Sequence, residues 1–313
     1  MRLLGYILRR LLQMIPVIIG ITLVAFLFIQ LLPGDPVQTM LGGKATPDEI
    51  ARIHAEFGLD QALPTRYFLF LGSALQGNLG LSITQRTPVT GLIGDRLVPS
   101  LFLLIYAVLI SVVLSLPLAI VAARRSDQPV DHAIRLTGMV TISMPAFWLG
   151  LLLILVFGLS LKMFPISGWG NDFAGHLRYL FMPALVIGLS MSPVLIQSLR
   201  ASLLDVMRAE FIEAARAKGL SPNRIMIRHV LRNALIPVVT VLAVNVGWLI
   251  GGSVIVENVF SIPGIGRLLV QSVLARDYPT IQGLTLVFGI LVIFINLLAD
   301  LSYAVIDPRV TYQ

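Results

Sequence analysis

Long apolar runs separated by short polar stretches dominate the hydrophobic pattern of the chain. A bilayer core about 30 Å thick is crossed by roughly 20 apolar residues in a helix, and six runs approach or exceed that length. The six runs are Leu11–Leu32, Ser100–Ala123, Leu136–Leu161, Tyr179–Leu199, Ala234–Val256 and Ile281–Val305. The pattern therefore predicts a polytopic membrane protein with six transmembrane segments.

The apolar runs are expected to be helices rather than the strands of a barrel. Only helices and closed barrels satisfy every backbone N–H and C=O inside lipid. Transmembrane strands are about ten residues long and alternate in polarity, whereas these runs are longer and uniformly apolar. We therefore predict an all-α fold. The first run lacks a small-residue cleavage pattern, so we interpret it as a retained anchor rather than a removed signal.

The longest segment between apolar runs comprises residues 33–99. Thr46 is expected to cap a helix that has Pro47 in its first position and Glu49 closing a capping box. A second helix is expected at about 64–76. The segment is either a lid that packs on the membrane helices or a docking site for a partner, and the sequence leaves both open.

A second polar segment, residues 200–233, is called the handle below. A helix is expected from Asp205 to Lys218, because Gly219 stands where a helix end needs a left-handed residue. Ser221 and Pro222 are expected to begin a second helix. A basic loop that only sets the topology would explain the charge of the handle. A helix–turn–helix that docks on a cytoplasmic partner would also explain the break at Gly219.

Composition and charge agree with a membrane protein. Hydrophobic residues make up 57% of the chain and charged residues 12%, about half the charged share of a soluble domain. With both termini in the cytoplasm, the inner segments hold 14 of the 23 Lys and Arg residues, and seven of these lie in the handle. Because short cytoplasmic loops are enriched in Lys and Arg, we predict an N-in, C-in orientation. The net charge of +7 therefore reflects topology and not nucleic-acid binding.

Several kinds of chemistry are missing from the sequence. The chain has no cysteine, which excludes disulfides and cysteine-ligated metals. The phosphate-binding pattern G-x-x-x-x-G-K-[ST] is absent, so we expect the chain neither to hydrolyse ATP by itself nor to be an enzyme. The four histidines are widely separated, which favours structural roles over a metal site, and no cofactor is expected. Asp300 lies near one end of the last run, where an interfacial position is preferred over a proton relay.

Within the handle, Glu213-Ala214-Ala215 is followed after three residues by Gly219. This spacing resembles the E-A-A-x-x-x-G signature of permease subunits of bacterial ABC importers. The chain departs from the signature further on: the usual apolar residue and proline are replaced by Leu231-Arg232, and Ile236-Pro237 comes later.

Further pieces, in the same order along the chain, resemble the peptide/opine/nickel importer group and within it the dipeptide-permease B type. The pieces are Leu32–Pro36, Phe57–Asp60, Gly77–Ser82, Ser143–Pro145, Ala215–Leu220, Leu231–Ala234, Pro263–Arg267, Arg276–Pro279 and Asp307–Arg309. Each piece is weak alone, but the ordered set covers most of the chain.

The resemblance implies a type I ABC importer permease fold in the bacterial inner membrane. Its parts would be an anchor helix at 1–32, an extracytoplasmic segment at 33–99, a five-helix core at 100–306 that includes the coupling helix region 205–233, and a cytoplasmic tail at 307–313. The implied partners are a homologous second permease in a heterodimer, two cytoplasmic ATP-binding subunits and an extracytoplasmic substrate-binding protein, besides membrane lipid. The 33–99 segment and the loop at 258–280 would face the binding protein.

The resemblance also implies which residues act. Coupling to the ATPase is expected at Glu213, Ala214, Ala215, Lys218 and Gly219. Small or polar residues inside the runs are candidates for the translocation pathway, and they are Ser190, Gln197, Asn245 and Gly247. Gly247 and Gly251 are also spaced for close helix packing, which explains them at least as well.

The implied function is import of dipeptides or oligopeptides by alternating access. Nickel-chelate, opine and glutathione import remain open, since in this architecture the binding protein does most of the selecting. A membrane-embedded enzyme such as an intramembrane protease would need a nucleophile and a base at mid-membrane, but no His or Asp lies near the middle of any run. A stand-alone channel would conduct without ATPase subunits.

Overall fold

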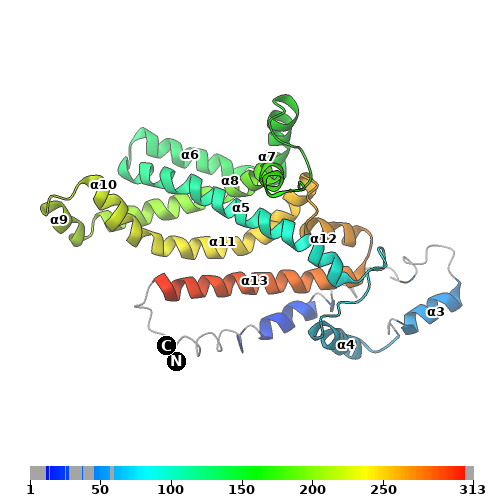
Figure 1. Ribbon diagram of the computed structural model, residues 1–313. Coiled ribbons are helices and arrows are strands. Elements are labelled where there is room, and N and C mark those ends of the chain that lie inside the picture. Colours follow the sequence, from blue (N-terminus) through cyan, green and yellow to red (C-terminus); the bar gives the residue numbers. More distant parts are fainter. Residues whose placement is uncertain are drawn as a thin grey trace. The chain divides into compact units, whose positions relative to one another are not determined.

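The computed structural model describes residues 12–13, 15–24, 26–27, 37, 46–56 and 60–306 (Figure 1). The chain divides into two compact units. One unit comprises Met1–Ser100 and Pro263–Ile293, and the other comprises Leu101–Ile262 and Phe294–Gln313. The secondary structure of the described residues is helical, apart from an isolated antiparallel bridge between Leu81 and Pro88. The prediction of an all-α fold is confirmed.

Three helices are long and apolar enough to cross a membrane: α5 (Val89–Arg124), α8 (Phe173–Met207) and α13 (Tyr278–Ile306). They coincide with the second, fourth and sixth predicted runs. Two bent helix pairs raise the number of candidate spans to five. The first run contains the apolar helix Ile15–Val24, and the ends of that run lie outside the described residues.

The third run is not one straight span, and in this respect the prediction is wrong. It consists of α6 (Pro129–Ser143), then α7 (Ala146–Leu153), which continues as a π-helix η1 (Ile154–Ser160). The two parts meet at an angle of 101°. Met144 and Pro145 between them have extended backbones, with ψ angles of 123° and 135°. Proline lacks an N–H and disfavours a helical conformation of the preceding residue, so it breaks the helix here.

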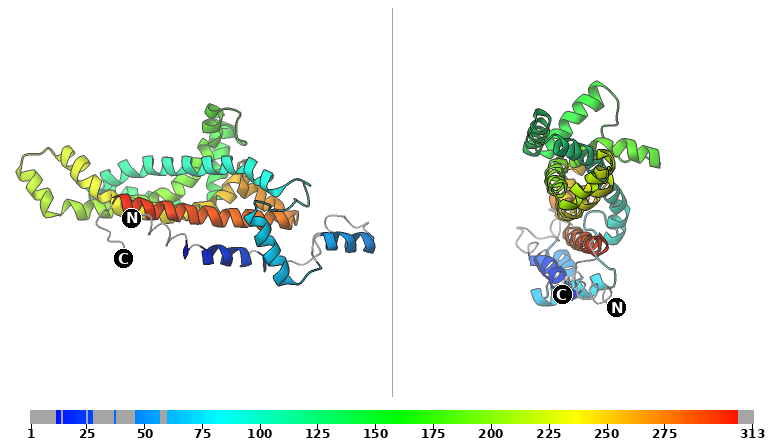
Figure 2. Two further views of the ribbon diagram at one scale, coloured as in Figure 1. Left: turned by 60° about the horizontal axis from the view of Figure 1, so that its bottom comes forward. Right: turned by 90° about the vertical axis from the view of Figure 1, so that its left-hand side faces the viewer.

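In the second unit, α8 lies among several other helices (Figure 1). It contacts α6, α7 and α11 (Arg232–Val259), and the right-hand view of Figure 2 shows α8 and α11 nearly end-on. Close approach depends on glycines. A Cβ added at Gly138 of α6 would lie 3.2 Å from Pro193 Cβ, and one at Gly188 would lie 3.2 Å from the carbonyl oxygen of Ala107 on α5. These glycines allow α8 to pack closely against both neighbours.

In the first unit, the predicted helix start at Thr46 is confirmed. The helix α3 (Pro47–Glu56) begins at Pro47. Glu49 accepts hydrogen bonds from the Thr46 amide at 3.0 Å and hydroxyl at 2.9 Å, and the Glu49 amide donates to Thr46 Oγ1 at 3.3 Å. This is a capping box, and these bonds lower the pKa of the Glu49 carboxyl. The second predicted helix is α4 (Leu63–Leu75).

Two pieces of the motif set that are far apart in sequence meet in the first unit. The buried carboxylate of Asp277, just before α13, accepts hydrogen bonds from the hydroxyls of Ser82 and Thr84 and from the amide of Ile83 at 3.0 Å. Asp277 follows α12 (Ile265–Leu274), whose Ile265 and Leu268 pack in one core cluster with Val89, Ile93 and Leu284. A side-chain network therefore fixes the turn at 81–88 to the start of α13.

The close approach of α8 and α5 leads to a stability prediction. Gly188→Leu places a side chain where a Cβ alone would already lie 3.0 Å from Ile110 Cγ2 and 3.2 Å from Ala107 O, so we expect a loss of about 1–3 kcal/mol of folding free energy. Gly94→Leu is the matched control, because Gly94 is exposed in α5 and a Cβ there meets nothing within 4 Å among the described residues. Thermal unfolding in detergent measures both variants, and equal stabilities would contradict this packing.

Candidate functional site

The first residues of the handle belong to α8, and a break in the helix follows them. The long helix ends at Met207, and α9 (Glu210–Ala217) follows after Arg208 and Ala209. The predicted helix start at Asp205 is therefore wrong, because α8 itself continues beyond that residue. The backbone of Ala209 is extended, with a ψ angle of 142°, which turns the chain before α9. Sequence periodicity alone does not show such a break, since Asp205 to Lys218 consists of residues that tolerate helix.

The short helix α9 has one buried and one exposed face. Ile212 is fully buried and Ala215 is 8% exposed, and both pack in a core cluster with Leu203 of α8 and Ile225 and Met226 of the following segment. On the other side Glu213, Ala214 and Lys218 are exposed, and the ring of Phe211 is 48% exposed. Of the predicted coupling residues, Ala215 therefore fixes the helix to the protein, and the others offer a free surface.

Gly219 ends α9 in the predicted left-handed conformation, with a φ angle of +75°. The amide of Gly219 donates to Arg216 O at 2.9 Å, and the amide of Leu220 donates to Ala215 O at 3.3 Å. This pair of bonds is a Schellman motif, and Leu220 adds the apolar contact that accompanies it by packing against the same core cluster. A Cβ at Gly219 would meet nothing within 4 Å in the described structure, so backbone conformation alone requires glycine here.

The second handle helix starts at Pro222 as predicted, but it does not end within the handle. The first four residues form α10 (Pro222–Ile225), and the chain continues through a π-helix η2 (Met226–Leu231) into α11. Ser221 has the extended backbone of an N-cap, although its side chain makes no capping hydrogen bond. Within the handle, α9 therefore lies between the end of α8 and the helical segment that starts at Pro222 and continues into α11.

The predicted pathway residues lie on α8 and α11. Ser190 and Asn245 are half-buried, and each donates to a carbonyl of its own helix, Ser190 to Val186 O at 2.9 Å and Asn245 to Val241 O at 2.7 Å. Gln197 is exposed. A Cβ at Gly247 would have no neighbour within 4 Å in the described part of the chain. No hydrogen bond between described residues joins these four positions.

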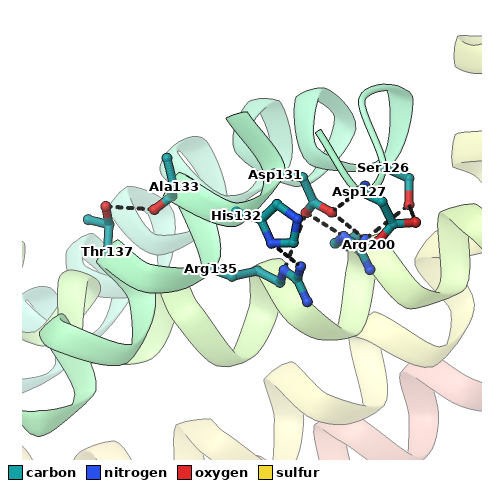
Figure 3. Close-up of polar contacts among 8 residues, drawn as sticks. All are labelled: Ser126, Asp127, Asp131, His132, Ala133, Arg135, Thr137 and Arg200. Carbon is teal, nitrogen blue, oxygen red and sulfur yellow. Dashed lines mark hydrogen bonds and ion pairs between the residues drawn. The ribbon is translucent and has the colours of Figure 1, made fainter. Parts of the chain in front are cut away.

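The end of α8 is held by a buried ion pair that the sequence did not reveal (Figure 3). Arg200 Nε donates to Asp131 Oδ1 at 2.7 Å, and Arg200 Nη2 donates to Asp131 Oδ2 at 2.5 Å. The side chain of Asp131 has no exposed surface, and that of Arg200 is 16% exposed. Bidentate pairing of this kind is both strong and directional. We call this pair the clamp.

Neighbouring groups extend the clamp to the turn between α5 and α6. Arg200 Nη2 also donates to Ser126 Oγ at 3.1 Å, and the Asp127 amide donates to Asp131 Oδ2 at 3.0 Å. Asp127 has a φ angle of +62°, a conformation that Asp tolerates better than most residues. Arg135 lies one turn further along α6. Its Nε is 3.7 Å from Asp131 Oδ1, and its side chain is 35% exposed. The turn is thereby fixed to α8.

Two more contacts connect the helix ends around the handle. Arg124 Nη2 donates to Asn223 Oδ1 at 3.0 Å, which links the end of α5 to α10. Ser202 Oγ donates to Ala234 O at 2.9 Å, which links α8 to the start of α11. Asp131 in the first turn of a proline-started helix was the available sequence signal, because acidic side chains favour helix N-termini. No pattern in the sequence predicts that Asp131 pairs with Arg200.

The clamp leads to a second stability prediction. Arg200→Met leaves a buried carboxylate without its partner, so we expect a loss of about 3–5 kcal/mol of folding free energy. Arg135→Met is the matched control, since Arg135 Nε lies 3.7 Å from the same carboxylate and makes no hydrogen bond to it among the described residues, so its loss should cost less. Thermal melts in detergent compare the two. If Arg200→Met melts no lower than Arg135→Met, the clamp does not stabilise the fold.

Comparison with known proteins finds similar sequences along nearly the whole chain. The family described as "Binding-protein-dependent transport system inner membrane component" matches residues 115–312, and the family of the corresponding N-terminal region matches residues 3–104. The oligopeptide transport system permease protein AppB of Bacillus subtilis is 36% identical over 98% of this chain and 99% of its own length. The glutathione transport system permease protein GsiC of Escherichia coli is 39% identical over 99% of this chain and 100% of its own length.

Solved structures share the fold at low identity. An inward-facing structure of the MetNI methionine ABC transporter has a TM-score of 0.57 and 18% identity, over 69% of this chain and 96% of that chain. An amino acid ABC transporter structure has a TM-score of 0.51 and 19% identity, over 69% of this chain and 94% of that chain. The chain belongs to the family of binding-protein-dependent transport system inner membrane components, and it is a permease subunit of an ABC importer.

Proposed function

We propose that this permease imports small peptides and that ATP-driven movement enters it through α9. The observation that carries the coupling proposal is the division of α9 into a buried and an exposed face. Ile212 and Ala215 hold the helix to the protein, and Phe211, Glu213 and Ala214 face outward. A helix fixed in this way would move together with the helix ends around it and would present its exposed face to a partner.

ATP would be hydrolysed by partner subunits, because the chain lacks a phosphate-binding loop. We propose two cytoplasmic ATP-binding subunits, one seated on the exposed face of α9. The family description implies a substrate-binding protein. A homologous second permease would complete a heterodimer and supply the other wall of the translocation pathway, to which Ser190, Gln197, Asn245 and Gly247 would contribute.

The proposed topology has six spans with both termini in the cytoplasm of a bacterium. The basic handle supports this orientation, since Lys and Arg concentrate in cytoplasmic loops. The parts are those expected from the sequence: the anchor at 1–32, the extracytoplasmic segment at 33–99, the core at 100–306 with its coupling region at 205–233, and the tail at 307–313. The bent pair α6–α7 would count as one span.

The proposed mechanism is alternating access. A conformational change requires that each ligand bind one state better than the other. ATP would favour the state in which the two ATPases close, and closure would move α9 and the attached end of α8. The binding protein would favour the outward-open state and release its substrate there. The clamp and the Ser202–Ala234 contact would carry the movement of α9 into α6 and α11.

The proposed substrate class is small peptides. The support is the pair of relatives named for oligopeptide and glutathione transport, of which glutathione is itself a small peptide. Nickel chelates and opines are the competing substrates within the wider group. Because the binding protein does most of the selecting, this chain contributes a pathway that tolerates a peptide rather than a pocket that recognises one.

Gly219 offers a direct test of coupling. Gly219→Val forces a β-branched residue into a left-handed backbone at a cost of about 1–2 kcal/mol, so the end of α9 shifts and we expect uptake to fall about tenfold in the assembled transporter. Gly219→Asn is the matched control, because asparagine tolerates this conformation and nothing within 4 Å among the described residues opposes its Cβ. Uptake and substrate-stimulated ATPase activity are measured in proteoliposomes. Equal uptake by the two variants would disprove the coupling role of this cap.

The substrate is tested with the transporter reconstituted together with its cognate binding protein. We expect ATP-dependent uptake of an isotopically labelled tripeptide and no uptake when the binding protein is omitted. A competition series adds unlabelled oligopeptide, glutathione, opine and nickel chelate. Inhibition by the two peptides supports the proposal. Uptake of the nickel chelate or opine without any peptide uptake would contradict the substrate class and leave the coupling proposal intact.

A further inference from the structure

The helix α4 belongs to the segment 33–99, which we place outside the cytoplasm. It has an apolar surface that no other described residue covers. Leu63 and Leu69 are 45% and 54% exposed, and Phe68 and Leu75 are 70% and 89% exposed. The helix carries one charged residue, Arg66, in its whole length. By contrast, α3 of the same segment exposes the charged side chains of Asp48, Glu49 and Arg52. The two helices therefore suit different surroundings.

Tyr67 fixes α4 to the first apolar helix, Ile15–Val24. Its hydroxyl lies 2.9 Å from Thr22 Oγ1 and donates to Ile19 O at 3.1 Å. Its ring meets that of Phe26 edge-on at 5.5 Å between centroids. Thr22, Phe26 and Tyr67 are 1%, 3% and 8% exposed. A buried Tyr with both a satisfied hydroxyl and an aromatic partner is a specific contact.

Two observations indicate how deep in the membrane this contact lies. Thr22 lies at the middle of the apolar run Leu11–Leu32. The adjacent Ile21 packs against α13, since a Cβ at Gly289 would lie 3.1 Å from Ile21 Cγ2, and Gly289 lies near the middle of the apolar stretch Tyr278–Leu298. A tyrosine side chain is short compared with a bilayer core of about 30 Å. The start of α4 therefore lies at membrane depth.

Arg66 is compatible with that depth. Its guanidinium lies 5.9 Å from the centre of the Phe26 ring, and Phe26 is one turn further than Thr22 towards the end of the apolar run. Long basic side chains extend along apolar surface towards the interface while their stems stay buried. A cation over an aromatic face is also an attractive arrangement. The charge thus lies beside a residue that is closer to the end of the apolar run than Thr22 is.

We propose that α4 is embedded in one leaflet of the membrane, with Phe68, Leu69 and Leu75 against lipid acyl chains. In the proposed orientation this is the extracytoplasmic leaflet. The segment 33–99 would then be held to the membrane surface by α4, while α3 stays in water. We favour lipid as the partner of this apolar face, because the contact of Tyr67 lies near the middle of the membrane. A binding protein approaches from the aqueous side and does not reach that depth. This inference does not depend on the coupling or substrate proposals.

The chain has no cysteine, so single cysteines introduced into this subunit can be spin-labelled uniquely when partner subunits are made cysteine-free. Phe68→Cys and Leu69→Cys test the apolar face, and Asp48→Cys in α3 is the aqueous control. Collision rates with oxygen and with a neutral nickel chelate are measured for the assembled transporter in phospholipid vesicles. We expect oxygen accessibility to exceed nickel accessibility severalfold at 68 and 69, and the reverse at 48.

Each other outcome overturns the proposal. Higher nickel than oxygen accessibility at 68 and 69 would place this face in water. Low accessibility to both reagents would show that a protein surface covers it, which points to the second permease or the binding protein. Two labelled positions on the face keep the test decisive if one variant fails to assemble, and uptake activity of each labelled transporter shows that it is folded.

Discussion

The second unit depends on one constraint: its central helix, α8, is buried on most of its sides. Of the most apolar stretch of α8, 67% is buried inside the protein, against 33% for α5 and 22% for α13. Lipid is as apolar as a leucine side chain, so close packing rather than the hydrophobic effect must hold such a helix in place. The glycine contacts of Gly138 and Gly188 supply that closeness. Because α8 is enclosed, its side chains contact several neighbouring helices along its length.

The polar contacts are placed where α8 leaves this enclosure. The clamp, the Arg124–Asn223 hydrogen bond and the Ser202–Ala234 hydrogen bond together connect the ends of α5, α6, α8, α10 and α11. A buried ion pair is expensive to desolvate and is a poor source of net stability, but it is strongly directional. Its value here is positional: it fixes α8 to α6 close to the end of α8 from which α9 follows.

The sequence predicted features that depend on local rules. Gly219 and the Thr46 capping box follow from backbone conformation and short-range hydrogen bonds, and both are confirmed. The bend at Pro145 and the break at Arg208 were missed, because hydropathy averages over both. The clamp was missed for a different reason: Asp131 and Arg200 are far apart along the chain, and only the packing of α6 on α8 brings them together. The pathway residues remain a prediction, since a second permease would have to complete their surroundings.

The central claim is that α9 and the connected helix ends move as one rigid block when the ATPases close. Spin labels at Ala217→Cys, at the end of α9, and Gln128→Cys, at the start of α6, measure this directly, because both positions are exposed and the chain has no other cysteine. The distance distribution between the labels is recorded by pulsed electron resonance in the nucleotide-free and ATP-bound transporter, with cysteine-free partners. A rigid block predicts the same distribution in both states. A shift or broadening on ATP binding would show that α9 swings independently of α6, and would contradict the claim.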